Sequence, residues 1–194
     1  MRIVAGALRG RTLKAPAGSE TRPTTDRVRE AVFSAVASIA GADLGGGTAL
    51  DAFAGSGALG FEALSRGCDR VVFAEQHRTA LATLKANVAA LGVAAQTDIV
   101  AGDVILLASR GTLPRSPFSL LLLDPPYRLE PAQVALFVEA LARNEQLVDG
   151  ALVVYEHGAG AGMAWPDGFS AIRSKRYGST EVDIAVFERG DAAE

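Results

Sequence analysis

One stretch decides the fold: Ala49-Leu50-Asp51-Ala52-Phe53-Ala54-Gly55-Ser56-Gly57-Ala58-Leu59-Gly60. A short apolar run leads into Asp51, and a turn with two glycines passes directly into a helical pattern, which predicts strand, tight turn and helix. Glycine adopts backbone torsions that a Cβ resists and lets a ligand approach the main chain. The free N–H groups at the start of a helix favour a polar or anionic ligand. The stretch therefore predicts a ligand site between strand and helix.

The glycine spacing alone leaves the ligand open. Gly55-x-Gly57-x-x-Gly60 satisfies the dinucleotide fingerprint, and the acidic residue Glu75 follows about 20 residues later at the end of the next predicted strand. An NAD site is therefore one alternative. A tight turn without a ligand is another, although such a turn rarely needs three glycines in six residues.

Two features favour S-adenosylmethionine (SAM) over a dinucleotide. Asp51 ends the first strand, where its negative charge suits an ammonium group and would repel a pyrophosphate. The tetrapeptide Asp124-Pro125-Pro126-Tyr127 follows the apolar run Leu120 to Leu123, and dinucleotide chemistry does not call for it.

The remaining pattern alternates strands and helices, which predicts an α/β protein with a three-layer, Rossmann-like sandwich. Strands are expected at 49–51, 70–74, 97–101, 118–123 and 151–155, with an antiparallel pair at 170–177 and 181–188. Helices are expected from Thr24 or Thr25 to Ile39 and over 58–66, 80–91, 104–109 and 131–147. Ligands of such sheets bind beyond the carboxyl ends of the strands. Five acidic residues stand at those ends: Asp51, Glu75, Asp103, Asp124 and Glu156.

Composition limits the class of protein. The chain has 194 residues, of which 49% are hydrophobic and 21% charged, as expected for one globular domain with a small appendage. It contains no apolar run of transmembrane length and no signal-peptide core, so a cytoplasmic location is expected. Its one cysteine, Cys68, and two separated histidines argue against a disulfide and a metal site.

Charge is distributed unevenly along the chain. The first thirty residues carry a net charge of +4, although the whole chain carries −3. A basic arm on an acidic body suggests contact with phosphate, and a solvated, charged terminus is the alternative. Residues 2–6 and 11–15 alternate around Leu8-Arg9-Gly10, which predicts a β-hairpin with a basic tip. Arg22, Arg27 and Arg29 near a helix start oppose the helix dipole, which favours a functional interpretation of their charge.

The sequence resembles the RsmD-type methyltransferases, which methylate the N2 amino group of a guanine in 16S ribosomal RNA. The matching stretches are Arg2-Ile3-Val4-Ala5-Gly6, Arg9-Gly10-Arg11, the segment from Arg22 to Phe33, Asp51 to Gly60, Glu62 to Gly67, Asp124 to Tyr127 and Tyr177-Gly178-Ser179-Thr180. The resemblance implies a seven-stranded SAM-dependent methyltransferase fold with an antiparallel last strand and an N-terminal β-hairpin arm. We expect a basic extension over 1–20, a methyltransferase domain over 21–189 and a disordered tail over 190–194.

The resemblance also implies roles for individual residues. The cofactor-binding set is Asp51, Phe53, Ala54, Gly55, Ser56, Gly57, Glu75, Gln76, Asp103 and Val104. In this set Glu75 accepts hydrogen bonds from the ribose hydroxyls, and Asp103 either contacts adenine or caps a helix. The catalytic set is Asp124, Pro125, Pro126 and Tyr127. The RNA-binding set is Arg2, Arg9, Arg11, Lys14, Arg22, Thr24 and Arg27.

The reaction begins with a weak nucleophile, because the N2 lone pair of guanine is delocalised into the ring. Asp124 and the carbonyl of Pro125 are expected to accept the amino hydrogens and stabilise the developing positive charge, while Tyr127 stacks on the base. The expected partner is 16S rRNA in an assembled or assembling 30S subunit, bound by a monomer. Removal of residues 1–15 is expected to leave SAM affinity nearly intact.

Other functions remain as alternatives at this point. A methyltransferase acting on DNA bases or on protein glutamine is one, but such enzymes often carry Asn where this chain has Asp124. A dinucleotide-dependent oxidoreductase and a non-catalytic RNA-binding module are the others.

Overall fold

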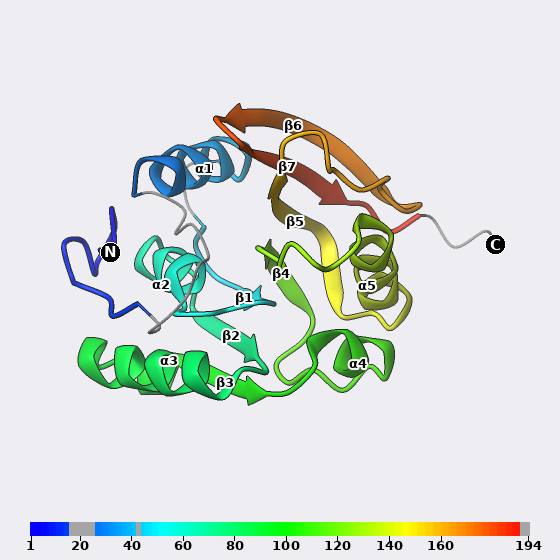
Figure 1. Cartoon of the computed structure of the whole chain (residues 1–194). Helices are drawn as coiled ribbons and strands as arrows, with labels where there is room; N and C mark the ends of the chain where they lie inside the picture. Colours follow the sequence, from blue (N-terminus) through cyan, green and yellow to red (C-terminus); the bar gives the residue numbers. More distant parts are fainter. Residues whose placement is uncertain (16–25, 42–43, 191–194) are drawn as a thin grey trace.

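A single mixed β-sheet forms the centre of the computed structural model, which describes residues 1–15, 26–41 and 44–190 (Figure 1). The strands are β1 (Thr48–Asp51), β2 (Arg70–Glu75), β3 (Thr97–Ala101), β4 (Phe118–Leu123), β5 (Leu147–Gly158), β6 (Phe169–Tyr177) and β7 (Thr180–Phe187). The helices are α1 (Asp26–Ile39), α2 (Ala58–Ser65), α3 (Arg78–Leu91), α4 (Val104–Ser109) and α5 (Pro131–Arg143), with a 3₁₀ turn η1 (Ala94–Gln96).

The strand order is β3-β2-β1-β4-β5-β7-β6. Strands β1 to β5 pair in parallel, whereas β7 runs antiparallel to both of its neighbours, β5 and β6. Asp51 lies level with Phe73 of β2 and Leu122 of β4, so the central strands end at one edge of the sheet. The predicted seven-stranded fold with a reversed last strand is confirmed.

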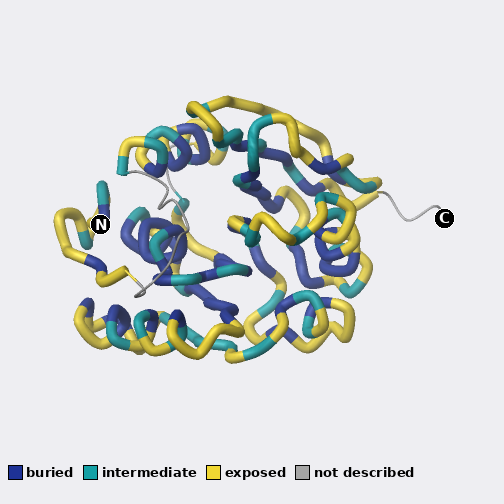
Figure 2. Tube along the Cα trace, in the orientation of Figure 1, coloured by how far each residue is buried: buried dark blue, intermediate teal, exposed yellow. Residues whose placement is uncertain are grey.

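Helices cover both faces of the sheet, as Figure 1 shows. The apolar run of β4 contributes to two hydrophobic clusters, because successive side chains of a strand point to opposite faces of the sheet. Leu120 and Leu122 pack in the cluster that holds α1, α2 and α3, whereas Leu121 and Leu123 pack in the cluster that holds α4 and α5. The buried central strands stand out in Figure 2. Within the described residues, no helix combines the length and apolar character that a membrane crossing requires.

Helix α5 and strand β5 depart from the predicted boundaries. The helix begins at Pro131 with a capping box between Glu130 and Gln133, but it ends at Arg143 rather than at Leu147. Asn144 follows, and its side-chain amide donates to the carbonyls of Ala108 and Ser109 at 2.8 and 3.2 Å. The helix ends because Glu145 takes a left-handed conformation, with φ +54°, and the N–H groups of Glu145 and Gln146 donate back to Ala142 and Leu141. The chain then enters β5, which is longer than the predicted 151–155.

Residues 1–15, called the arm from here on, fold back on themselves as the hairpin prediction requires. Regular pairing within the arm is limited to one antiparallel bridge, between Arg2 and Thr12. The reason is that the N–H groups of Val4 and Ala5 donate to the carboxylate of Glu62 in α2 instead of to the facing segment. The arm is therefore a hairpin-like loop that uses its polar groups to bind the body.

The arm also contributes to the hydrophobic core. Ile3 and Leu13 are buried in the cluster of α1, α2 and α3. Gly6 has φ +80°, and a Cβ at this position would overlap the carbonyl of Ser65, because the backbone of the arm lies against that of α2. The proposed division at residue 20 stays a prediction, but the arm is packed as part of the body.

Candidate active site

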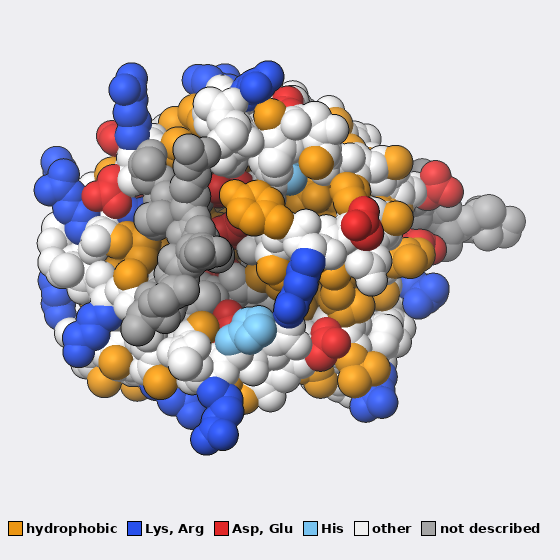
Figure 3. Space-filling view, in the orientation of Figure 1, with side chains coloured by type: hydrophobic (Ala, Val, Ile, Leu, Met, Phe, Trp, Pro, Cys, Tyr) orange, Lys and Arg blue, Asp and Glu red, His pale blue; other side chains and the backbone are white. Residues whose placement is uncertain are grey.

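A cavity of about 1150 Å³ opens at the carboxyl ends of the strands. All five acidic residues predicted at strand ends line it: Asp51, Glu75, Asp103, Asp124 and Glu156. Figure 3 shows acidic side chains in the hollow at the middle of this face, and most of the Lys and Arg side chains around its periphery, although one of them lies beside the hollow. The cavity is thus suited to a ligand with positive charge, while its surroundings are suited to a polyanion.

The turn between β1 and α2, called the glycine turn, is held to the next strand. The N–H of Ala54 donates to Ala74 at 3.0 Å, and the N–H of Gly55 donates to Oε2 of Glu75 at 2.9 Å. Gly57 begins the helix with φ +86°, and a Cβ there would collide with Phe61 and Leu84. Phe53, Ala54, Gly55 and Ser56 line the cavity, whereas Gly57 is not among the lining residues and acts through its backbone conformation.

Asp51 is buried at the base of the cavity. Its Oδ2 accepts a hydrogen bond from the N–H of Gly60 at 2.9 Å. Burial raises the pKa of this carboxyl to about 7, and the charge of Glu75 acts in the same direction, although the hydrogen bond from Gly60 opposes the shift. A ligand cation at this point would stabilise the ionised form, so Asp51 fits the ammonium group for which it was predicted.

Glu75 ends β2 and connects two loops. Its Oε2 accepts from Gly55, and its Oε1 accepts from the N–H of His77 at 2.7 Å. A carboxylate oxygen has two lone pairs, so each oxygen can still accept from a ribose hydroxyl. Gln76 also lines the cavity.

Asp103 caps α4, which was one of its two predicted roles. Its Oδ1 accepts from the N–H groups of Ile105 and Leu106 at 2.9 and 3.4 Å. Asp103 and Val104 both line the cavity, so the contact with adenine stays a prediction alongside the confirmed cap.

Asp124 follows β4 and opens onto the same cavity. Asp124 is exposed at the mouth of the cavity, yet the surrounding protein atoms displace much of the water around its carboxyl. This burial raises the pKa of Asp124 well above its usual range, and the nearby charges of Glu156 and Asp51 raise it further. Pro125, Pro126 and Tyr127 also line the cavity, and the side chain of Tyr127 is 76% exposed. The four predicted catalytic residues are therefore together beside the predicted cofactor set.

The predicted RNA-binding residues divide into three groups. Arg2, Arg9 and Arg27 line a second cavity of about 380 Å³ between the arm and α1. Arg11 is exposed and donates to the carbonyl of Ala90 at 2.6 Å, and Lys14 is exposed beside α3. Arg22 and Thr24 lie outside the described residues, as do the predicted helix caps Thr24 and Thr25.

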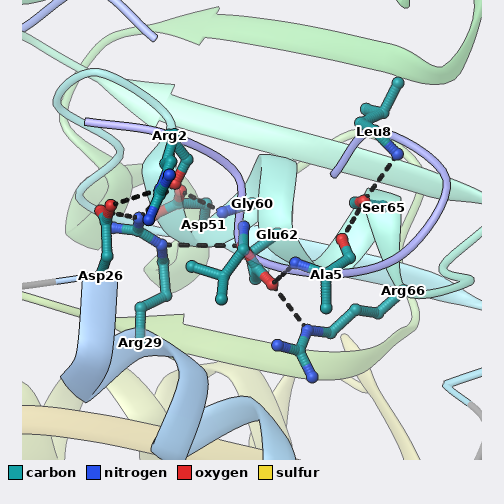
Figure 4. Close-up of polar contacts among 11 residues, drawn as sticks. Arg2, Ala5, Leu8, Asp26, Arg29, Asp51, Gly60, Glu62, Ser65 and Arg66 are labelled. Carbon is teal, nitrogen blue, oxygen red and sulfur yellow. Dashed lines mark hydrogen bonds and ion pairs between the residues drawn. The ribbon is translucent and has the colours of Figure 1, made fainter. Parts of the chain in front are cut away.

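Arg29 does not present its charge to solvent, which gives this cation a structural role, and the functional interpretation of its charge stays a prediction. Its side chain is fully buried and donates to the carbonyl of Arg2 at 2.6 Å and to Asp26 at 2.7 Å (Figure 4). Its Nε lies 3.7 Å from the carboxylate of Glu62. The cation therefore connects α1 to the arm and to α2.

The structure adds three polar residues that the sequence reasoning missed. Glu62 and Ser65 of α2 and Asn87 of α3 are buried, and each binds the backbone of the arm. The sequence did hold a signal, because Glu62 is the one charged residue in α2, and Asn87 lies three residues from Leu84 on a buried face. Arg29 likewise stands three and four residues before Val32 and Phe33.

The family model described as "Conserved hypothetical protein 95" matches residues 1–186. The chain belongs to this family, the RsmD family. Ribosomal RNA small subunit methyltransferase D of Escherichia coli is 35% identical over 190 residues, which cover 97% of this chain and 90% of that protein. The protein of the same name from Haemophilus influenzae is 32% identical over 178 residues, covering 92% and 89% of the two chains.

Solved structures agree with a methyltransferase fold. The structure described as "Putative methyltransferase yhhF from Escherichia coli" superposes with a TM-score of 0.81 at 32% identity, covering 97% of this chain and 98% of that one. The structure of magnesium protoporphyrin IX methyltransferase from Synechocystis, which holds bound SAM, has a TM-score of 0.61 at 18% identity and covers 82% and 79%. This second likeness shows the fold alone. The predicted RsmD membership and methyltransferase fold are confirmed.

Proposed function

We propose that this RsmD-family protein transfers a methyl group from SAM to the exocyclic N2 of a guanine in 16S rRNA. The observation that carries the proposal is the position of Asp124-Pro125-Pro126-Tyr127, which opens onto the same cavity as the glycine turn. The names of the related rRNA methyltransferases support RNA methylation. The target atom rests on the resemblance and on the chemistry of the tetrapeptide.

The residues present fit SAM as the cofactor. Residues 53–56, Glu75 and Gln76, and Asp103 and Val104 would hold it, with Asp51 facing its ammonium group. The fit rests on the donor set, because a buried carboxylate with a raised pKa gains most from a cationic ligand. When bound, SAM supplies an electrophilic methyl group on a positively charged sulfur.

Asp124 and the carbonyl of Pro125 would accept the two hydrogens of the amino group. This turns the nitrogen lone pair towards the methyl group and stabilises the positive charge that develops on nitrogen. Asp124 performs this role best as a carboxylate, so its raised pKa predicts that the rate falls as the pH is lowered through that pKa. The exposed ring of Tyr127 is available to stack on a base that has left its helix.

The arm would bring the RNA to this site. Arg9 and Arg11 are exposed on it, and Arg2 and Arg27 flank the second cavity, so several cations can face phosphates at once. We infer 16S rRNA in an assembled or assembling 30S subunit as the partner, bound by a monomer in the cytoplasm.

The test is the transfer of tritiated methyl from SAM to small subunits that lack the modification, followed by mapping of the product. Asp124→Asn keeps an acceptor oxygen but loses the charge, so we expect a rate between those of the wild type and Asp124→Ala. The alanine variant should be slower than the wild type by about 10²–10³-fold in single turnover. SAM binding, measured by calorimetry, should change little in both variants.

The matched control is Asp167→Asn, which makes the same chemical change at an exposed loop residue outside the cavity lining. It should keep the wild-type rate. A near-native rate for Asp124→Ala would show that the catalytic centre lies elsewhere. A methyl group on a different atom or base would overturn the guanine-N2 assignment.

A further inference from the structure

One buried amide connects the arm to the glycine turn. Asn87 is 1% exposed on the inner face of α3. Its Oδ1 accepts from the N–H of Lys14 at 2.9 Å, and its Nδ2 donates to the carbonyl of Lys14 at 3.0 Å. The same Nδ2 donates to the carbonyl of Ser56 at 2.9 Å. The side chain thus connects Ser56, which lies 31 positions earlier in the sequence, with Lys14, which lies 73 positions earlier.

The chemistry of the amide fixes its orientation. Lys14 presents both a donor and an acceptor to it, and Ser56 presents a second acceptor, so the nitrogen must face the two carbonyls. An asparagine has two N–H hydrogens, and both are used here. A shift of Lys14 therefore moves the group that holds Ser56, because the amide has no further donor with which to replace a lost contact.

A second observation places the arm beside the predicted cofactor. Met1 and Ala15, near the two ends of the arm, line the main cavity together with Ser56. Met1 is itself tied to the far side of the arm, since its carbonyl accepts from the N–H of Leu13 at 2.9 Å. The arm and the glycine turn form adjoining parts of one wall.

We propose that Asn87 is a positioning residue that couples RNA binding at the arm to SAM binding at the glycine turn. When SAM orders the glycine turn, Asn87 fixes Lys14, and when RNA fixes the arm, Asn87 holds Ser56 in the SAM-binding arrangement. The coupling is reciprocal, so each ligand raises the affinity for the other by the same factor. The identity of the two ligands rests on the proposed function.

This proposal reverses one expectation from the sequence. A basic extension that only contacts RNA could be removed without loss of SAM affinity. An arm that lines the cavity and shares Asn87 with the glycine turn cannot, because its removal leaves the buried amide without both of its contacts to Lys14.

The other anchors of the arm provide a matched control. Ser65 holds the first half of the arm on α2, where its Oγ accepts from the N–H of Leu8 at 2.9 Å and donates to the carbonyl of Ala5. In the described structure Ser65 makes no hydrogen bond to the glycine turn. Ser65→Ala therefore loosens the arm without touching Ser56, whereas Asn87→Ala and Asn87→Asp break the connection itself.

The first measurement follows amide hydrogen exchange with S-adenosylhomocysteine, the demethylated product, as the probe. In the wild-type protein the probe should slow exchange at Lys14 about tenfold or more. In Asn87→Ala this slowing should vanish. In Asn87→Asp the acceptor for the N–H of Lys14 remains but both donors are lost, so the slowing should also vanish.

The second measurement is the affinity of the probe by calorimetry. Loss of the contact to Ser56 should weaken binding about fivefold in both Asn87 variants, as expected for one net hydrogen bond. Ser65→Ala should keep the wild-type affinity. Unmodified small subunits should raise the affinity of the wild-type protein for the probe and leave that of Asn87→Asp unchanged.

The outcomes separate the two proposals. Failure of the wild-type protein to bind the probe would overturn the proposed function. Binding without any change in exchange at Lys14 would overturn the coupling and leave the function standing. Equal weakening by Ser65→Ala and Asn87→Ala would also overturn it, because a general loosening of the arm would then suffice. Because exchange at Lys14 is measured in the wild-type protein, unchanged exchange would overturn the coupling even if an Asn87 variant does not fold.

Discussion

Replacement of Glu62 by alanine should destabilise the protein by about 3–5 kcal/mol, the usual cost of removing one partner from a buried ion pair. The carboxylate is fully buried and accepts from Val4 at 2.8 Å, from Ala5 at 3.1 Å and from Nε of Arg66 at 2.7 Å. It also lies 3.7 Å from Nε of Arg29. The variant would leave two backbone donors of the arm without an acceptor and a buried guanidinium with less compensating charge.

Asp26 keeps the loss from being larger. It lies 2.7 Å from Nη2 of Arg29, so the buried cation should keep one carboxylate partner when Glu62 is removed. For a protein of this size the change corresponds to a melting temperature lower by about 10 °C. The free energy of unfolding should be measured in urea at pH 7 for the wild type and the variant.

A double-mutant cycle tests whether Glu62 and Arg29 interact in the folded protein. Arg29→Met removes the cation while filling its space, and the combined variant Glu62→Ala, Arg29→Met should lose clearly less than the sum of the two single changes. A single-variant loss below about 1 kcal/mol would refute the argument. A strictly additive cycle would show that Glu62 acts only through the arm backbone and Arg66.

Two further predictions concern Asp51 and Gly60. Because the pKa of Asp51 is about 7 in the folded protein, against an ordinary value of 3.8, its ionisation opposes folding, and the stability that the neutral carboxyl gives is lost as the pH rises from about 4 to 7. Urea unfolding across this range should show that the free energy of unfolding of Asp51→Asn rises relative to that of the wild type as the pH increases, by about 4 kcal/mol in total. A difference that does not depend on pH would contradict the raised pKa. A Cβ at Gly60 would run into Phe73 and Val71, so Gly60→Ala should cost about 1–3 kcal/mol by thermal unfolding, while Gly190→Ala, whose Cβ meets nothing within 4 Å, should be neutral. Equal melting temperatures for the two glycine variants would disprove the close packing of α2 on β2.

The parts of the fold that local pattern determines were predictable from the sequence. The apolar run of β4 has the predicted bounds, because a strand buried on both faces leaves an unbroken signal. The acids at strand ends meet in one cavity, since parallel strands bring their carboxyl ends to one edge. The helix that was predicted to reach Leu147 ends earlier, at a left-handed turn formed by Glu145, and the sequence has no glycine there to indicate the stop.

The docking of the arm was not predictable in the same way. Charge counts treat every arginine alike, yet Arg9 is exposed while Arg29 is fully buried. The difference arises from Glu62, which lies 33 positions from Arg29 and 58 from Val4 in the sequence. Pairing across such distances depends on tertiary packing, and only the position of a lone polar residue in an apolar face indicates that a partner exists.

The place of β7 between β5 and β6 has a consequence for the order in which the chain can fold. Strands β1 to β5 all lie before residue 159, and without β6 and β7 they would leave the edge of β5 uncovered, with Leu152, Val153 and Val154 next to unpaired backbone groups. Such an edge can pair with another nascent chain. The β6–β7 hairpin removes this hazard when it docks through its second strand, and it places the exposed β6 outermost, with Arg173, Lys175 and Arg176 on it. Like charges along that strand then discourage the finished proteins from joining edge to edge.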